Sequence, residues 1–313
     1  MKRRIIFAHS LLVAAVFFLG CSGASFIPKF LSRTVEHMSE PRQSVPNKIT
    51  SPILANVGLS VLWIGHATAL IQIGDRVFLT DPMFTNTAGM VSGRVIEPGV
   101  DPASISRVDY TLISHTHFDH FSYGSLDQLP KNGALLLPLG ALPYTPEFGF
   151  RETREMKPWE VLEEGNVKIT AVPVKHFSGR YGFDIPWMTD RGYTGYVIEY
   201  RGKTVFVSGD TGYDQDIFKE IGRRFTIDVA FLPIAPIEPR EFMQRVHTDP
   251  KEALQIFEDL GARLMIPIHH RTFYQGLEPR ITYAQELLEQ LVAERGLQQK
   301  VYIVKIGEQR IFE

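Results

Sequence analysis

Residues 114–120 read SHTHFDH and directly follow the apolar run Tyr110–Ile113. Three histidines and one aspartate within six positions supply imidazole nitrogens and a carboxylate, which are ligands of borderline metal ions such as zinc. In an extended segment His115 and His117 point to the same side, so both can reach one ion. Asp119 and His120 lie past the turn and can reach a second ion. The stretch therefore predicts a metal site at the end of a strand.

Three other apolar runs also end in potential metal ligands. His176 follows residues 172–175, Asp210 follows residues 205–209 within GDTG, and His269 follows residues 265–268. Residues that stand just after strands can project from one edge of a sheet into one cleft. We therefore expect these three to complete the site that the first stretch begins.

Composition narrows the class of protein. The chain has 313 residues, of which 44% are hydrophobic and 22% charged, as in ordinary globular proteins. Its net charge of −2 gives no reason to expect nucleic acid as a partner, because nucleic acid requires a basic surface. The single cysteine, Cys21, excludes an internal disulfide and a structural cysteine–zinc site.

The N-terminus predicts export. MKRR precedes an apolar run over residues 5–20, and Cys21 and Ser22 follow it. Residues 1–21 resemble a bacterial lipoprotein signal, which implies that Cys21 is lipidated and anchors the chain in the cell envelope, with the outer membrane favoured. An uncleaved membrane anchor is the alternative, although the run is shorter than the roughly 20 residues that span a membrane.

The remaining pattern predicts a tether and a layered α/β domain. Residues 22–55 are expected to be a tether and irregular lead-in with a short helix around 30–38, and residues 56–313 the main domain. Strands are expected over 59–65, 67–74, 76–81, 110–114, 167–174, 194–199, 204–208, 229–234 and 264–268, with a final hairpin over 301–313. Helices are expected from Asp249 to Gly261 and from Thr282 to Gly296. The helices are too few for strict strand–helix alternation, so stacked sheets with helices outside fit better.

The motifs resemble those of a known family. H-x-H-x-D-H, a later histidine, GDTG and a final histidine are similar to the pattern of the metallo-β-lactamase superfamily. GHAT, HFSGR, HTDP and IHHRTF, within residues 59–273, resemble the branch that contains N-acylphosphatidylethanolamine-hydrolysing phospholipase D. The resemblance implies a four-layer αββα sandwich with a binuclear metal site at the sheet edge.

The resemblance also implies a role for each site residue. His115, His117 and His176 would hold one ion, Asp119, His120 and His269 would hold the second, and Asp210 would bridge them. Two Zn²⁺ ions with a hydroxide between them are expected, and Mn²⁺ or Fe²⁺ would also suit these ligands. Asp119, Asp210 and His247 are the candidate catalytic residues, with His247 as donor to a substrate oxyanion or acid to the leaving group. His66 either orients a ligand or is simply a buried histidine, and His270 is expected to point elsewhere. Arg180 is expected to be solvated, with pairing to an anionic substrate group as the alternative.

Three functions are compatible with this reading. The first is a membrane-anchored phosphodiesterase of the phospholipase D type, acting on phospholipid-like molecules through a metal-bound hydroxide. The apolar stretches 135–150 and 181–188 would then receive acyl chains, unless they only cover the core. The second is a hydrolase that opens lactones or other rings. The third is a non-catalytic metal-containing envelope protein, for which a missing ligand would be expected.

Overall fold

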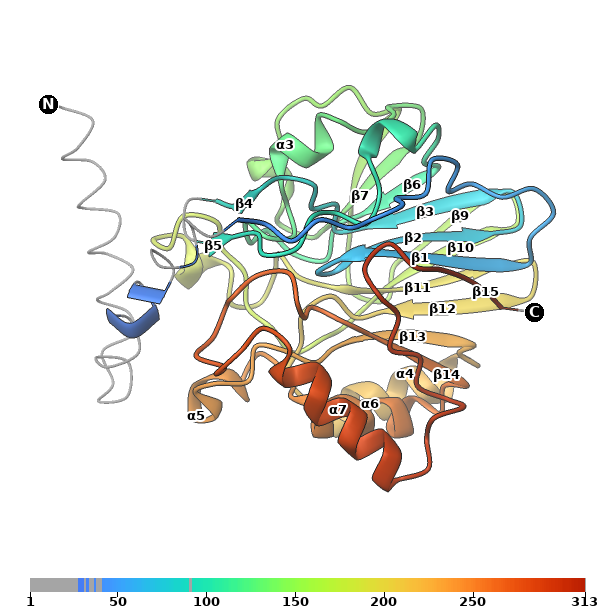
Figure 1. Ribbon diagram of the computed structural model, residues 1–313. Coiled ribbons are helices and arrows are strands. Elements are labelled where there is room, and N and C mark those ends of the chain that lie inside the picture. The colour runs from blue at the N-terminus through green and yellow to red at the C-terminus, as the bar shows by residue number, and fades with distance from the viewer. Residues whose placement is uncertain (1–27, 31, 34–36, 38–40, 90–91, 313) are drawn as a thin grey trace, which may run out of the picture.

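The computed structural model describes residues 28–30, 32–33, 37, 41–89 and 92–312 (Figure 1). The predicted signal and Cys21 lie outside these residues. The helix expected around 30–38 is only partly covered, and its described residues are helical. Within the described ranges, no helix has the length and apolar character needed to cross a membrane.

Two mixed sheets form the centre of the fold. The first has the order β15 (Gln309–Phe312), β1 (Leu59–Gly65), β2 (Thr68–Ile73), β3 (Arg76–Thr80), β6 (Tyr110–Leu112), β7 (Ala134–Pro138) and β8 (Glu152–Met156). The second has the order β14 (Leu264–Ile268), β13 (Val229–Pro233), β12 (Lys203–Val207), β11 (Gly195–Tyr200), β10 (Val167–Val172) and β9 (Val161–Glu164). A small ribbon of β4 (Thr87–Ala88) and β5 (Ser92–Gly93) lies apart from both.

Strand β1 shows how the sequence builds the layers. All seven of its residues are buried. Leu59, Val61 and Trp63 pack in the core between the two sheets. Leu62 and Ile64 pack on the opposite face, under the outer layer. Successive side chains of a strand point to opposite faces, so a continuous apolar run is what a strand covered on both sides requires.

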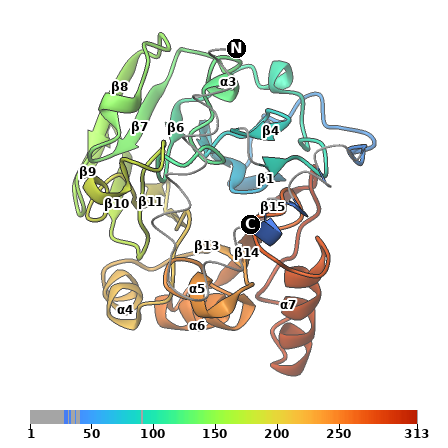
Figure 2. The same ribbon diagram turned by 90° about the vertical axis from the view of Figure 1, so that its left-hand side faces the viewer.

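The outer layers are unequal. Helices α4 (Gln215–Arg224), α6 (Pro250–Leu260) and α7 (Tyr283–Glu294) cover the second sheet, as the end view in Figure 2 shows. The first sheet is covered by the short helix α3 (Tyr123–Leu126) together with loops and 3-10 turns. A further short helix, α5 (Arg240–Met243), precedes α6. The predicted αββα sandwich is therefore confirmed, with one outer layer much less helical than the other.

Both predicted helices are confirmed, although α7 ends two residues before the expected Gly296. The Asp249 carboxylate accepts a hydrogen bond from the Glu252 backbone N–H at 2.8 Å and so caps α6. Gly261 ends α6 with a left-handed φ of 60°. Helix α7 begins directly after Thr282, with Leu288 fully buried.

The predicted C-terminal hairpin is wrong. Only β15 is a strand, and it pairs with β1 in antiparallel fashion. Val301 forms a single bridge to Met265 at the edge of the second sheet. Residues 301–308 therefore cross from the edge of one sheet to the edge of the other, and this path needs no hairpin. The apolar composition that suggested a strand instead serves burial, since Val301 and Val304 lie in the core.

Part of the stretch that was expected to receive acyl chains is core. Residues 134–138 form β7, and Leu135, Leu136 and Leu137 are fully buried. This part of residues 135–150 therefore belongs to the core, which was the alternative to receiving acyl chains. Leu142, after the strand, is 49% exposed.

Candidate metal centre

Strand topology brings the predicted ligands to one edge of the sandwich. Strands β10 and β11 are antiparallel, as are β11 and β12, whereas β12, β13 and β14 are parallel. Strands β10, β12 and β14 therefore run in the same direction, so the residues that follow them leave the sheet at the same edge. These residues are His176, Asp210 and His269. The tetrad of His115, His117, Asp119 and His120 follows β6 of the other sheet.

The seven predicted ligands and His66 converge. Their potential ligand atoms form three overlapping groups, in each of which all atoms lie within 4.8 Å of one another. These groups are His115–His117–His176, His115–His120–Asp210 and His66–Asp119–His120–His269. The structure thus brings together every residue that was predicted as a metal ligand.

The buried polar atoms of the cluster fit a metal ion. The Nε2 atoms of His115 and His176 are buried without a hydrogen-bond partner. Their other ring nitrogens are engaged, His115 Nδ1 with Ser114 Oγ and His176 Nδ1 with the Val246 carbonyl, both at 2.9 Å. A partner at Nδ1 directs Nε2 toward the centre of the cluster, as in metal-binding histidines. Leaving such nitrogens unpaired is costly, so the arrangement is suited to a metal ion.

Electrostatics favour the metal-binding form of His115, His117, His176 and Asp210. Burial lowers the pKa of His115, His117 and His176, which keeps the imidazoles neutral and able to bind metal. Burial acts to raise the pKa of Asp210, but the neighbouring His269 and His120 lower it well below the usual range. The carboxylate therefore remains charged. Burial also acts to lower the pKa of His120 and His269, but the neighbouring Asp210 carboxylate raises both, so these two imidazoles would release a proton on binding a metal ion.

Asp81 supports the tetrad and was missed by sequence reasoning. It follows β3 and is 1% exposed. Its carboxylate accepts hydrogen bonds from the backbone N–H and hydroxyl of Ser114, each at 2.6 Å, and lies 2.8 Å from His120 Nδ1. The sequence did contain a signal, because Asp81 directly follows the apolar strand β3, just as His269 directly follows β14.

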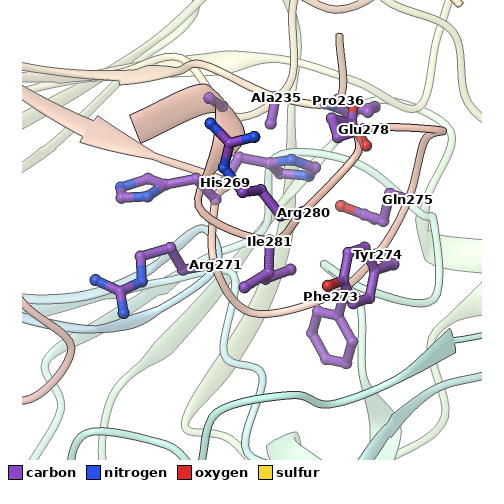
Figure 3. A pocket seen from close by; sticks show the side chains of 12 residues that line it. Ala235, Pro236, His269, Arg271, Phe273, Tyr274, Gln275, Glu278, Arg280 and Ile281 are labelled. Carbon is purple, nitrogen blue, oxygen red and sulfur yellow. The ribbon is translucent and has the colours of Figure 1, made fainter. Parts of the chain in front are cut away.

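Two further side chains contact the Asp119 carboxylate. His66 Nε2 lies 2.9 Å from Asp119 Oδ2, which is the contact expected of a residue that orients a ligand. Burial lowers the pKa of His66 to about 3. Gln275 Nε2 donates a hydrogen bond to the same oxygen. Figure 3 shows Gln275 and His269 among the residues that line a small pocket beside the cluster. No motif distinguished Gln275 in the sequence.

His247 lies at the margin of the cluster. Its Nδ1 is 3.5 Å from Asp210 Oδ2, and its side chain is 13% exposed. Burial lowers the pKa of His247 to about 4. His270, in contrast, is directed away from the cluster and stacks on Trp63 with ring centroids 4.6 Å apart. The expectation that His270 points elsewhere is thus confirmed.

The expectation of a solvated Arg180 is wrong. Arg180 is 6% exposed and donates hydrogen bonds to backbone carbonyls of the turn that carries the tetrad. Sequence reasoning favoured a solvated arginine over one that pairs with an anionic substrate group. The structure buries it because three aromatic rings and two carbonyl oxygens surround its guanidinium.

Comparison with curated proteins identifies relatives along most of the chain. "N-acyl-phosphatidylethanolamine-hydrolyzing phospholipase D 1" of Caenorhabditis elegans is 27% identical over 320 residues, which cover 92% of this chain and 88% of that protein. "N-acyl-phosphatidylethanolamine-hydrolyzing phospholipase D, mitochondrial" of Saccharomyces cerevisiae is 29% identical, and the match covers 80% of this chain but only 55% of that protein. A "UPF0173 metal-dependent hydrolase" of Methanopyrus kandleri is 29% identical over 80% of this chain and 98% of that protein.

Solved structures share the fold. An isothiocyanate hydrolase from Delia radicum gut bacteria superimposes with a TM-score of 0.65 at 18% identity, covering 81% of this chain and 99% of that one. The metallo-beta-lactamase fold protein YhfI from Bacillus subtilis gives a TM-score of 0.55 at 17% identity, with 80% and 99% covered. Residues 76–270, more than half of the chain, match the family described as the Beta-lactamase superfamily domain. The fold, the His/Asp cluster and this match together establish that the chain belongs to the beta-lactamase superfamily.

Proposed function

We propose that this chain is a metal-dependent hydrolase that cleaves phosphodiesters in phospholipid-like molecules with the help of two divalent ions. The observation that carries the proposal is the convergence of buried imidazoles and carboxylates from two sheets on one place. The names of the relatives support it, since they include metal-dependent hydrolases and phospholipases of the D type.

The cluster offers a ligand set for each of two ions. One ion would be held by His115, His117 and His176, and the other by Asp119, His120 and His269. Asp210 would lie between them, because its Oδ2 is 4.0 Å from His115 Nε2 and 3.4 Å from His120 Nε2. Its Oδ1 is 3.1 Å from His269 Nε2. A set of imidazoles and carboxylates without thiolate suits Zn²⁺, and also Mn²⁺ or Fe²⁺.

Two such ions, when bound, lower the pKa of water and stabilise negative charge on a phosphoryl oxygen. The protein's own residues supply positions and protons. Asp119 and Asp210 place negative charge at the centre of the cluster. His66 and Gln275 hold the Asp119 carboxylate in position through contacts with its Oδ2. The partly exposed His247, which its lowered pKa keeps neutral, would donate a hydrogen bond to a substrate oxygen that gains charge. To pass a proton to the leaving group it would first have to be protonated.

An aromatic groove beside the cluster supports an amphiphilic substrate. The groove has a volume of about 550 Å³, and the aromatic residues that line it are Tyr123, Tyr144, Tyr181, Phe183 and Trp187. Phe118, which stands between His117 and Asp119, lies 6.3 Å from Tyr181 between ring centroids. Trp187 is 69% exposed. An acyl chain in this groove would place the polar end of a lipid near the cluster.

We also propose, from the sequence of residues 1–21, that Cys21 carries the lipid that holds the enzyme in the bacterial envelope. An anchored enzyme would meet lipid substrates continuously. The proposal is tested by metabolic labelling with a palmitate analogue, for which Cys21→Ser should lose the label.

The test of the function uses the full-length chain in detergent, reconstituted with Zn²⁺ or Mn²⁺. The substrates are bis(p-nitrophenyl) phosphate, mixed micelles of N-acylphosphatidylethanolamine, and a panel of lactones. Asp210→Asn should abolish turnover. Asp190→Asn is the matched control, because Asp190 is 71% exposed and pairs with its neighbour Arg191.

Each substrate class has a defined consequence. Metal-dependent phosphodiester cleavage that releases phosphatidic acid, lost in Asp210→Asn and kept in Asp190→Asn, would support the proposal. Cleavage of lactones without phosphodiesters would indicate the ring-opening alternative. Tight metal binding without any turnover would indicate the non-catalytic alternative.

A further inference from the structure

Arg180 is buried directly behind the turn that carries the tetrad. Only 6% of this residue is exposed, and burial lowers its pKa. A buried guanidinium destabilises a protein unless its donors are paired, so its partners indicate what the residue does.

The guanidinium joins the two ends of one short turn. Arg180 Nη1 donates to the Thr116 carbonyl at 3.1 Å and to the Phe121 carbonyl at 2.8 Å. Residues 117–120, which contain three of the predicted metal ligands, lie between these two carbonyls. The turn also has an internal bond from the Phe121 N–H to the His117 carbonyl at 2.8 Å. Arg180 therefore links the two ends of the turn by hydrogen bonds from a side chain outside it.

Aromatic rings surround the guanidinium on its other sides, where Nε is buried without a hydrogen-bond partner. Its central carbon lies 3.9 Å from the centroid of Tyr123 and 4.5 Å from that of Phe118. Both distances are within the range of cation–π attraction. Since Phe118 stands between His117 and Asp119, this contact also constrains the backbone that orients those two side chains.

The segment around Arg180 is itself fixed. Ser178 Oγ and Thr116 Oγ1 are 2.7 Å apart, which joins this segment to the same turn. The Asp184 carboxylate accepts hydrogen bonds from the backbone N–H groups of Arg180 at 2.8 Å and Tyr181 at 2.9 Å. Arg180 is thus attached to a rigid base rather than to a free loop.

We propose that Arg180 is a positioning residue that holds the turn 117–120 in the conformation in which His117, Asp119 and His120 bind metal. The inference rests on the proposed metal function of the cluster. An arginine is required because two carbonyls and three aromatic rings are contacted by one planar group, whereas a lysine ammonium is a point donor without a flat face.

The test measures Co²⁺ affinity rather than activity. Full-length chain freed of metal is titrated with Co²⁺, and the visible absorption of the bound ion reports affinity and ligand geometry. Arg180→Met keeps the length of the side chain but removes the charge and donors, and Arg180→Lys keeps the charge. Arg191→Met is a matched control on the exposed surface. Leu288→Ala, on the buried face of α7, is a control for general destabilisation.

We expect Arg180→Met to weaken Co²⁺ binding about 10–100-fold, as loss of a residue that orients ligands typically does. Arg180→Lys should give a smaller loss, with an altered absorption spectrum in both variants. Arg191→Met and Leu288→Ala should bind as the wild type does. If Arg180→Met does not fold, Arg180→Lys decides.

The inference is overturned if the folded Arg180 variants bind Co²⁺ within about twofold of wild type, where a loss of at least tenfold is expected. An equal loss in Leu288→Ala would also overturn it, since the effect would then reflect general instability. If the wild type binds no Co²⁺ at all, the proposed metal function fails and not only the role of Arg180.

Discussion

At the scale of single residues, Asp81 holds the tetrad in place through its contacts with Ser114 and His120. Asp81→Asn keeps the shape of the side chain but replaces an oxygen that faces Ser114 Oγ and His120 Nδ1 with an amide nitrogen. We expect metal affinity to fall about 10–100-fold without loss of the fold. Competition with a chelating dye measures this. Asp75→Asn, at an exposed position, is the control, and equal affinities in the two variants would contradict the role of Asp81.

Gly209 and Gly261 have the same left-handed backbone conformation, so a comparison of their alanine variants separates the cost of backbone strain from the cost of steric crowding. Gly209 has a φ of +62°, and an added Cβ would lie 2.3 Å from Ser114 Cβ. Gly261 has a φ of +60° with nothing within 4 Å of such an atom. Both alanine variants lose the freedom of a left-handed glycine, but only Gly209→Ala also overpacks the site, at about 1–3 kcal/mol.

Denaturant unfolding measures this difference. Gly209→Ala should lower the free energy of unfolding by about 1–3 kcal/mol more than Gly261→Ala does. Equal losses would mean that the turn after β12 can move away from Ser114, and that the tight approach does not constrain the site.

The sequence predicted the ligands much better than the residues that hold them. His115, His176, Asp210 and His269 each follow an apolar run, and that local signal sufficed. The contact of Gln275 with Asp119 depends on the path of the loop after β14, which no local pattern reveals. The burial of Arg180 depends in the same way on rings supplied by another segment.

At the scale of elements, most strands that are covered on both faces were predicted, but β7 was not, because its residues were interpreted as part of an apolar stretch that receives acyl chains. Strands β1, β2 and β14 have nearly continuous apolar runs because each is buried. Strands β8 and β9 were missed because they lie at the edges of their sheets and read ETREM and VLEE. Charged residues are common on edge strands, where they discourage pairing with other chains. Helix α4 was missed although Asp214 caps it.

Edge strand β9 also carries an ionic link between the sheets. Glu164 Oε2 accepts a hydrogen bond from the Tyr110 hydroxyl of β6 at 2.7 Å, and Arg151 pairs with the same carboxylate. Arg151 and Tyr110 lower the pKa of Glu164 to about 2. A lowered pKa stabilises the folded state above the ordinary pKa of glutamate, and the stabilisation is lost as the pH falls toward 2.

Comparison of wild type with Glu164→Gln tests this link. The wild type should be more stable near pH 7 by at most about 1 kcal/mol, because the pair is exposed to solvent. The difference should disappear between about pH 4.5 and pH 2. Urea unfolding at several pH values measures it, with Glu163→Gln, at an exposed ion pair, as control. A difference that grows on acidification would contradict the account.

At the scale of the whole molecule, the two sheets supply four and three ligands of the proposed metal centre. The tetrad follows β6 of the first sheet, whereas His176, Asp210 and His269 follow strands of the second. The complete ligand set therefore exists only when both sheets are packed together, so metal binding should stabilise the whole sandwich.

Thermal unfolding tests that coupling. A ligand at about 100 times its dissociation constant stabilises the folded state by about 2.7 kcal/mol per site. Removal of metal with a chelator should therefore lower the melting temperature of wild type by several degrees. Asp210→Asn should lose most of this response and Asp190→Asn should keep it. An identical response in both variants would place the bound metal elsewhere.

The central claim is that the His/Asp cluster holds two metal ions. The most direct measurement is the metal content of purified full-length chain after reconstitution and removal of free metal, by plasma mass spectrometry. The account predicts about two equivalents per chain, as in two-metal hydrolytic sites, and fewer in Asp210→Asn. A wild-type chain with no bound metal, or a ratio unchanged in Asp210→Asn, would contradict it.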